Sequence, residues 1–294
     1  MKRRLVKQGA ATMMISLPSK WVKENKLDKG DEIDIESKGN KLEISIGSND
    51  KRKEVEVNVS SLTESAARTI ITNTYRYGYD KVKVNFSNKN SLALIEDTVK
   101  NNLLGFEIIK RSDKYCEIEN ITEPSHEQIE NIFSKMFMNI DELFLIAEKM
   151  LSGEKENFEE VEKKIQQFDN FCRRVILKKG LTEKATQKML FHSEIIHAQR
   201  EIYHLLRYLS NNKAKNTNSA IYLLKKCKEV FDHVKEAYLK KDLSLIEKIH
   251  EIEKELVYKK GYSQIKENPI VIHHLMTSIR EFYLSTSPLV AIIL

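Results

Sequence analysis

Apolar residues recur every three or four positions through the second half of the chain. The spacing continues from residue 125 onward, and the 171 residues from Pro124 to the C-terminus contain only three of the nine glycines. Side chains at these intervals fall on one face of an α-helix, so the pattern predicts amphipathic helices packed around a buried core. The C-terminal half is therefore expected to be all-α.

Breaks in this pattern divide residues 125–294 into six expected helices. Gly153 and Gly180 end the first two, and the polar stretch 211–218 separates the first three from the last three. The expected helices cover 125–153, 158–180, 183–211, 217–239, 243–259 and 269 onward. Two sets of three helices indicate tandem three-helix bundles.

Residues 1–47 show a different pattern, with short strands around one helix. Alternation predicts strands at 4–7 and 13–17, and Pro18 is suited to the start of a helix over 19–25. The last two strands cover 33–36 and 42–46 and are joined by a turn at 38–40, which is a hairpin pattern. We expect this segment to form a separate β-rich domain.

Residues 54–121 repeat a strand-then-helix pattern. The expected elements are strands over 55–59, 82–86, 106–110 and 115–121, with helices over 62–77 and 91–104. This order predicts a small α+β domain, ferredoxin-like in plan, and makes the whole chain a multidomain α+β protein. It contains no glycine loop of the kind that holds phosphate, so we interpret the domain as a spacer or a dimerisation module.

Charge is unevenly distributed along the first domain. Residues 1–23 contain six Lys and Arg residues and no Asp or Glu, whereas residues 24–36 contain six acids. The whole chain carries a formal net charge of +6, and this distribution predicts a positive edge on the first domain. The candidate DNA-contacting residues are Lys2, Arg3, Arg4, Lys7, Gln8, Thr12 and Lys20.

The four basic residues nearest the N-terminus are expected in one strand. Arg3 and Lys7 then point to one side, and Lys2 and Arg4 to the other. With the three other candidates they would form a ridge that fits the major groove and contacts phosphates. The alternative is that this basic run is simply solvated.

The first 46 residues resemble the swapped-hairpin AbrB/MazE/SpoVT DNA-binding domain. The resemblance rests on the basic first strand, the loop Gly9-Ala10-Ala11-Thr12, the strand end Ile15-Ser16-Leu17-Pro18, Trp21, and Leu27-Asp28-Lys29-Gly30-Asp31. It implies that two chains interleave their hairpins into one dimeric barrel and present the first-hairpin basic residues to double-stranded DNA. Dimerisation would also explain how about 47 residues bury enough apolar surface to fold.

The helical half resembles the PhoU family, whose fold is two three-helix bundles in tandem. The combination of both domains resembles archaeal regulators that join them. This resemblance implies a role in the control of phosphate uptake. Many family members hold metal clusters with Glu-x-x-x-Asp pairs, which place two carboxylates on one helix face.

This chain departs from that acidic pattern at several positions. Glu162 is present, but Gln166 stands where the second acid is expected. In the segment 199–204, Gln199 and Tyr203 replace the Glu and Asp of the family motif, and Ser287 stands where another Asp is expected. We therefore expect no metal site and no cofactor.

No catalytic constellation emerges from the remaining residues, so an enzyme is not expected. Five histidines are interpreted as partly buried or surface residues without acids at ligand spacing, and the three cysteines as neither disulfides nor zinc ligands. The basic helix end is interpreted as complementing the helix dipole. These residues are His192, His197, His204, His273 and His274; Cys116, Cys172 and Cys227; and Arg173, Arg174, Lys178 and Lys179.

The chain is expected to be cytoplasmic. The longest stretch without a charge is the 13 residues of 282–294, which is short of the roughly 20 that a spanning helix needs. The N-terminus shows no signal-peptide pattern. The apolar end of the chain, 288–294, is expected to pack against the bundle or against a second protomer, without direct membrane insertion.

These observations predict a homodimeric transcriptional regulator of phosphate uptake. Residues 1–47 would bind DNA, and residues 125–294 would sense or transmit phosphate status. One alternative is an adaptor whose helical half docks on a phosphate transporter or a signalling kinase, with the N-terminal barrel used only for dimerisation. A second alternative is an antitoxin-like module.

Overall fold

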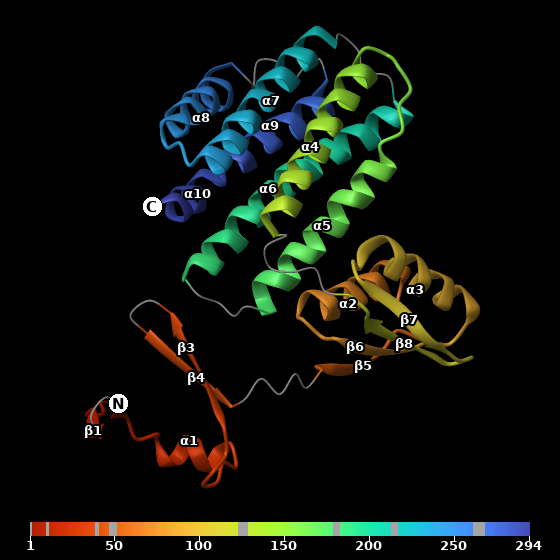
Figure 1. Ribbon diagram of the computed structural model, residues 1–294. Helices are drawn as coiled ribbons and strands as arrows, with labels where there is room; N and C mark the ends of the chain where they lie inside the picture. The colour runs from red at the N-terminus through yellow and green to blue at the C-terminus, as the bar shows by residue number, and fades with distance from the viewer. Residues whose placement is uncertain are drawn as a thin grey trace. The chain divides into compact units, whose positions relative to one another are not determined.

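A computed structural model describes eight segments of the chain: 2–9, 12–38, 41–46, 52–122, 129–178, 183–212, 217–260 and 268–294. The chain divides into two compact units, Met1–Arg52 and Lys53–Leu294, and each is described by itself (Figure 1). The fold mixes helices with small sheets, and the C-terminal half is helical, as the apolar spacing predicts.

The first unit consists of two antiparallel hairpins and a short helix. Its elements are β1 (Val6–Gln8), β2 (Thr12–Met14), α1 (Ser19–Glu24), β3 (Ile33–Lys38) and β4 (Lys41–Ile46). β1 pairs with β2 and β3 with β4, and α1 begins directly after Pro18. The expected loop residues Ala10 and Ala11 and turn residues Gly39 and Asn40 lie outside the described part of the chain.

The expected first strand is shorter in the structure than the sequence suggests. β1 begins at Val6, so Lys2, Arg3 and Arg4 precede the strand and have no regular structure. The ladder ends at the pair Val6 and Met14, which means that β2 offers no further backbone partner for the basic residues. The prediction of one strand with basic residues on alternating sides is wrong for these three positions.

The second unit begins with an α+β domain. Its elements are β5 (Glu54–Asn58), α2 (Glu64–Arg76), β6 (Lys81–Asn85), α3 (Lys89–Asn102), β7 (Phe106–Arg111) and β8 (Tyr115–Asn120). The sheet order is β5-β6-β8-β7, with β5 parallel to β6 and the other pairs antiparallel. Figure 1 shows α2 and α3 on one side of the sheet, where Ile71, Tyr75 and Ile95 are fully buried.

The ferredoxin-like plan is a wrong prediction. That plan needs a hairpin between the two helices, whereas here both helices come before the hairpin of β7 and β8. β8 then pairs with β6 rather than with the first strand. The expected and the observed order of elements along the chain are the same, so this order already excludes the ferredoxin-like plan. Only the pairing of β8 with β6 depends on contacts between distant segments.

The rest of the second unit is a helical domain with one continuous core. Its elements are α4 (Ile129–Leu151), α5 (Glu159–Lys178), α6 (Glu183–Asn211), α7 (Thr217–Lys240), α8 (Ser244–Glu255), a π-helical turn η2 (Leu256–Lys260), α9 (Pro269–Leu284) and α10 (Thr286–Ile293). The spans of the first five expected helices are close to those of α4 to α8 with η2. The sixth is divided at Ser285 into α9 and α10.

Helices α4 to α6 are here called the first set and α7 to α10 the second set; both sets share one core. Within the sets, α4 contacts α5 and α6, and α7 contacts α8 and α9; between them, α6 packs along α9 and α4 along α7. The apolar C-terminal residues pack against this bundle, since Leu289 and Ile292 of α10 are buried. None of the described helices is both long and apolar enough to cross a membrane.

Candidate functional site

The predicted DNA-contacting residues all lie in the first unit and are exposed. β1 and β2 place Gln8 opposite Thr12, with Lys7 next to this pair. Lys20 lies on α1, where its Nζ is 3.8 Å from a Glu24 carboxylate oxygen. The structure therefore brings Lys7, Gln8 and Thr12 together on one hairpin, preceded by the irregular basic segment 2–4.

The first unit has an apolar face that is not covered within the unit. β3 and β4 pair Ile35 with Ile44, and the alternation of the strands puts Ile33 and Leu42 on the same face of the hairpin as this pair. Ile35 is 59% exposed and Leu42 66%. No residue of this unit whose burial is described is buried. A hairpin with such a face needs a partner surface to be stable in water.

In the second unit, α5 is anchored to the α+β domain by Arg174. Its side chain is 1% exposed and donates to the Tyr79 carbonyl at 2.8 Å and to Asp80 Oδ1 at 2.6 Å. The guanidinium also lies over the Tyr75 and Phe106 rings. The sequence interpretation of Arg174 as complementing the helix dipole misses these contacts, because they come from a neighbouring domain; Lys179 lies outside the described residues.

Asp169, also on α5, is buried among three basic groups. Its oxygens lie 2.9 Å from Arg76 Nη2, 2.6 Å from Arg173 Nε and 2.8 Å from His192 Nε2. Burial by itself raises the pKa of Asp169, but the hydrogen bond from His192 and the two guanidiniums outweigh it and hold the pKa below its usual range. The Nδ1 atom of His192 is buried and has no hydrogen-bond partner among the described residues.

Beside this cluster lies a cleft of about 700 Å³, here called the arginine cleft. It is formed by α2, the end of α3, α5 and α6, and its lining residues are Ser65, Arg68, Thr69, Thr72, Asn73, Arg76, Asn102, Gln166, Asp169, Asn170, Arg200, Tyr203, His204 and Arg207. Four of them are arginines. The lining has one acid, Asp169, and that carboxylate is already paired with arginines and His192.

Basic groups in the arginine cleft repel each other. Burial lowers the pKa of Arg76, and the charges of Arg173 and Arg200 lower it further. Burial also lowers the pKa of His204, and the charges of His274, Arg200 and Arg207 lower it further, against the opposite effect of Glu201. Guanidinium groups, hydroxyls and amides in one cleft match the geometry and charge of an oxyanion such as a phosphate group.

The acidic positions implied by the family resemblance hold a hydrogen-bonded amide network. Gln166 Nε2 donates to Glu162 at 2.9 Å, and Gln199 Nε2 donates to the other carboxylate oxygen. Burial raises the pKa of Glu162 to about 7. The two amides that replace acids in this chain occupy both oxygens of Glu162, and Tyr203 lies on the arginine cleft instead.

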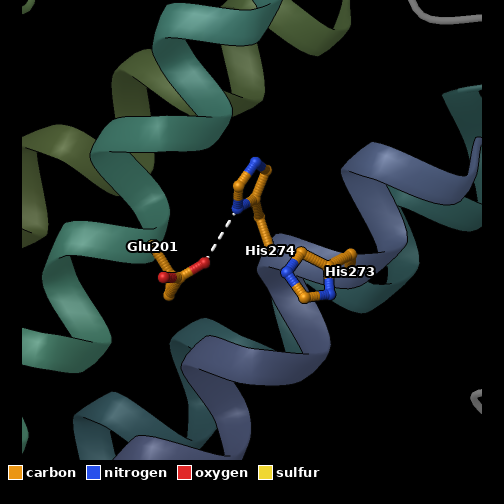
Figure 2. A group of neighbouring side chains, drawn as sticks. All are labelled: Glu201, His273 and His274. Carbon is orange, nitrogen blue, oxygen red and sulfur yellow. Dashed lines mark hydrogen bonds and ion pairs between the residues drawn. The ribbon is translucent and has the colours of Figure 1, made fainter.

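Sequence reasoning missed a group of acids and histidines between α6 and α9. Figure 2 shows Glu201 of α6 facing His273 and His274 of α9, and His274 Nδ1 lies 2.8 Å from Glu201 Oε2. A second group contains Glu194, His197 and Glu281. The sequence analysis interprets these histidines as lacking acids at ligand spacing. In the structure acids lie beside them, because the packing of α6 along α9 joins residues more than 70 positions apart.

One sequence pattern points to these groups. Glu194 and His197, and also Glu201 and His204, form two Glu-x-x-His pairs seven residues apart. Residues three and seven apart share a helix face, so both pairs lie along one side of α6. The residues of α9 that complete the groups, His273 and His274 in one and Glu281 in the other, have no marker of their own in the sequence.

Comparison with known protein families, curated proteins and solved structures gives no match to this chain.

Proposed function

We propose that the protein is a homodimeric DNA-binding regulator of phosphate uptake, in which the first unit binds double-stranded DNA and the helical domain receives the regulatory signal. One observation carries this proposal: residues 2–23 hold six basic residues and no acid, and the basic side chains of this segment are exposed. Phosphates of a duplex are the natural counterpart of such a segment, because each contact releases condensed counterions.

The geometry of the first hairpin supports this reading. Lys2, Arg3 and Arg4 lie outside the ladder, so they are able to follow a phosphate backbone, while Gln8 and Thr12 face each other across the ladder. Polar side chains of this kind hydrogen-bond to base edges in the major groove. In this proposal the basic residues supply affinity, and the pair of polar residues supplies sequence preference.

Dimerisation of the first unit is part of the proposal. The apolar face around Ile35 and Leu42 has no cover within the unit, and a second copy of the same face would bury it. A two-fold dimer would carry two basic segments and therefore read a two-fold-related pair of half-sites. This arrangement agrees with the swapped-hairpin barrel that the sequence resemblance implies.

The arginine cleft is the proposed entry point of the signal. It is lined by α2 of the α+β domain and by α5 and α6 of the helical domain, so a bound oxyanion would contact both. Phosphate is the oxyanion that the resemblance to phosphate regulators implies. Binding there would hold the α+β domain and the helical domain together. The DNA-binding unit would then respond to the reduced motion between these two domains.

DNA binding is tested by fluorescence anisotropy of the full chain on a duplex from its own upstream region and on a scrambled duplex, across a salt series. The test variant is Arg3→Ala/Arg4→Ala, and the matched control is Lys26→Asn/Lys29→Ala, which removes the same charge from the same unit outside the segment 2–23. We expect the test variant to lose preferential binding and to reduce the slope of log affinity against log salt by about two. Equal, weak binding to both duplexes by the native protein would contradict the proposal.

Signal entry is tested by calorimetric titration of the full chain with inorganic phosphate. Arg200→Ala should weaken binding by about tenfold, since a charge-assisted hydrogen bond contributes about 1.5–3 kcal/mol. Lys248→Ala, an exposed lysine on α8, is the control and should bind as the native protein does. Phosphate binding that is unchanged in Arg200→Ala would remove the arginine cleft from the proposal and leave DNA binding untouched.

An adaptor function is the second candidate, and an exposed apolar pair favours it. Met138 and Leu145 are seven residues apart on α4 and are 68% and 60% exposed. Two such side chains on one helix face suit contact with a transporter or signalling protein. Co-purification with such a protein that is lost in Met138→Lys/Leu145→Lys, together with failure of the DNA test, would support the adaptor.

A further inference from the structure

The seam between α6 and α9 carries a cluster of three potential metal ligands that the proposed function does not use. Glu201 comes from α6, and His273 and His274 are consecutive on α9. One ligand atom from each residue lies within 4.8 Å of the other two. His273 is exposed, so the cluster opens to solvent and an ion could enter.

Convergence of these three side chains depends on the packing of the two helices. Consecutive residues on a helix point about 100° apart. Two adjacent histidines can therefore reach a common point only if their side chains turn toward it from opposite sides. Figure 2 shows the Glu201 carboxylate lying in the space toward which both imidazole rings turn. A third donor from the neighbouring helix thus completes the group, which neither helix forms alone.

The donor set determines which ions fit. Two imidazole nitrogens and one carboxylate oxygen are ligands that zinc and similar first-row divalent ions prefer, whereas calcium and magnesium take oxygen ligands. We propose that Glu201, His273 and His274 form a binding site for a divalent transition-metal ion of the zinc class. Three protein ligands leave one coordination position for water or an anion.

Only small movements are needed for an ion to bind. Zinc–ligand bonds of about 2.0–2.1 Å place tetrahedral donors about 3.3 Å apart, and the donors here are already within 4.8 Å. Side-chain rotation closes the difference. The 2.8 Å contact between His274 Nδ1 and Glu201 Oε2 would be replaced by two bonds to the metal, and any proton on the coordinating nitrogen would leave to solvent.

A metal at this place would act as a clamp. α6 belongs to the first set of three helices and α9 to the second, so the ion would join the two sets where they pack together. Binding to the folded chain alone stabilises it in proportion to the logarithm of metal concentration. The site is separate from the basic segment of the first unit, and its existence does not depend on DNA binding.

The second group, formed by Glu194, His197 and Glu281, lies along the same seam and is the natural comparison. It offers one imidazole and two carboxylates, so it is the poorer match for zinc. We therefore assign the tight site to the group with two histidines. Variants in each group can tell the two locations apart.

The test is calorimetric titration of the metal-stripped full chain with Zn²⁺, supported by the visible absorption of bound Co²⁺. We expect one tight site per chain and a rise in Tm with added Zn²⁺. His273→Ala and Glu201→Gln should each weaken binding by at least about tenfold and abolish the rise in Tm. His233→Ala removes a histidine of α7 that belongs to neither group, and it should bind as the native protein does.

Three results would overturn the assignment. The first is a native protein that binds Zn²⁺ no more tightly than the His273→Ala variant does. The second is loss of the tight site in His197→Ala together with its retention in His273→Ala, which would place the metal at the second group. The third is equal weakening by His233→Ala, which would indicate unspecific surface binding. Circular dichroism of Glu201→Gln, which keeps the side-chain volume, verifies that a loss of binding is not a loss of fold.

Discussion

Replacing Arg174 by alanine tests whether one buried cation holds α5 to the α+β domain. The native side chain is 1% exposed, forms an ion pair with Asp80 at 2.6 Å, and donates to the carbonyls of Tyr75 and Tyr79 at 3.0 and 2.8 Å. Alanine removes the charge, the donors and the stacking on two aromatic rings. The variant should therefore weaken the packing between the two domains of the second unit.

The size of the effect follows from what remains around Asp80. Breaking a buried ion pair costs about 3–5 kcal/mol when the other charge is left alone. Here Asp80 keeps Lys178 at 3.0 Å and the Lys53 amide at 3.2 Å, so it is not left as a lone charge. The loss of the ion pair should therefore cost about 3 kcal/mol, the lower end of this range. The Tyr79 carbonyl also loses the donor that Arg174 supplies, which adds about 1 kcal/mol. We expect a loss of about 4 kcal/mol.

Urea unfolding of the full chain, followed by far-UV and near-UV circular dichroism, measures this loss. Arg174→Lys keeps the positive charge but lacks the planar guanidinium, so its free energy of unfolding should lie between those of the native protein and Arg174→Ala. Lys163→Ala is the control on the same helix: its partner Glu160 is 71% exposed, so the change should cost no more than about 1 kcal/mol. An Arg174→Ala variant within 1 kcal/mol of the native protein would refute the anchoring role.

Three further predictions follow from single positions. Gly105→Ala should lower the free energy of unfolding by at least about 2 kcal/mol in the same assay, because Gly105 has a φ of +80° and an added Cβ would lie 1.9 Å from the Thr122 carbonyl oxygen. The control Gly153→Ala, whose added Cβ meets no atom within 4 Å, should lower it less. Equal losses in the two variants would contradict the clash. Burial raises the pKa of Glu162 from 4.5 to about 7, so the folded chain holds a proton that the unfolded chain has lost, and the native protein loses stability as pH rises through this range. Glu162→Gln cannot ionise, so its stability relative to the native protein should increase from pH 5 to pH 8, and a flat difference would argue against a raised pKa. Ile35→Asp should convert the proposed dimer to a monomer in light scattering, and a dimer mass retained by the variant would show that the apolar face of β3 and β4 is not the dimer contact.

The sequence predicts the helices well because helical spacing is a local property. Seams of apolar residues through 129–178 and 183–260 match α4 to α8 with η2 to within a few residues. The hairpin of β3 and β4 is predicted for the same reason, since its alternation and its turn lie within 14 residues. The helical C-terminal half follows from the sequence in this way.

Pairing between distant segments is what the sequence leaves open. It predicts the order of strands and helices in the α+β domain, but not that β8 pairs with β6, because several pairings bury similar apolar faces. It also leaves open where the first strand begins: Lys2, Arg3 and Arg4 were expected in that strand, yet its ladder ends at Val6 and Met14.

The chemistry of the second unit was decided by tertiary structure. In the sequence, Arg174 is part of a basic helix end that complements the helix dipole, and only the docking of α5 on the α+β domain buries it against Asp80. Glu201 and His274 are 73 positions apart, and only the packing of α6 along α9 brings them to 2.8 Å. The sequence by itself determined which segments are helical and where positive charge collects, because both depend on neighbours along the chain. The arginine cleft and the cluster of Glu201, His273 and His274 depend on the tertiary structure, because each combines side chains from helices that meet only after the core has formed.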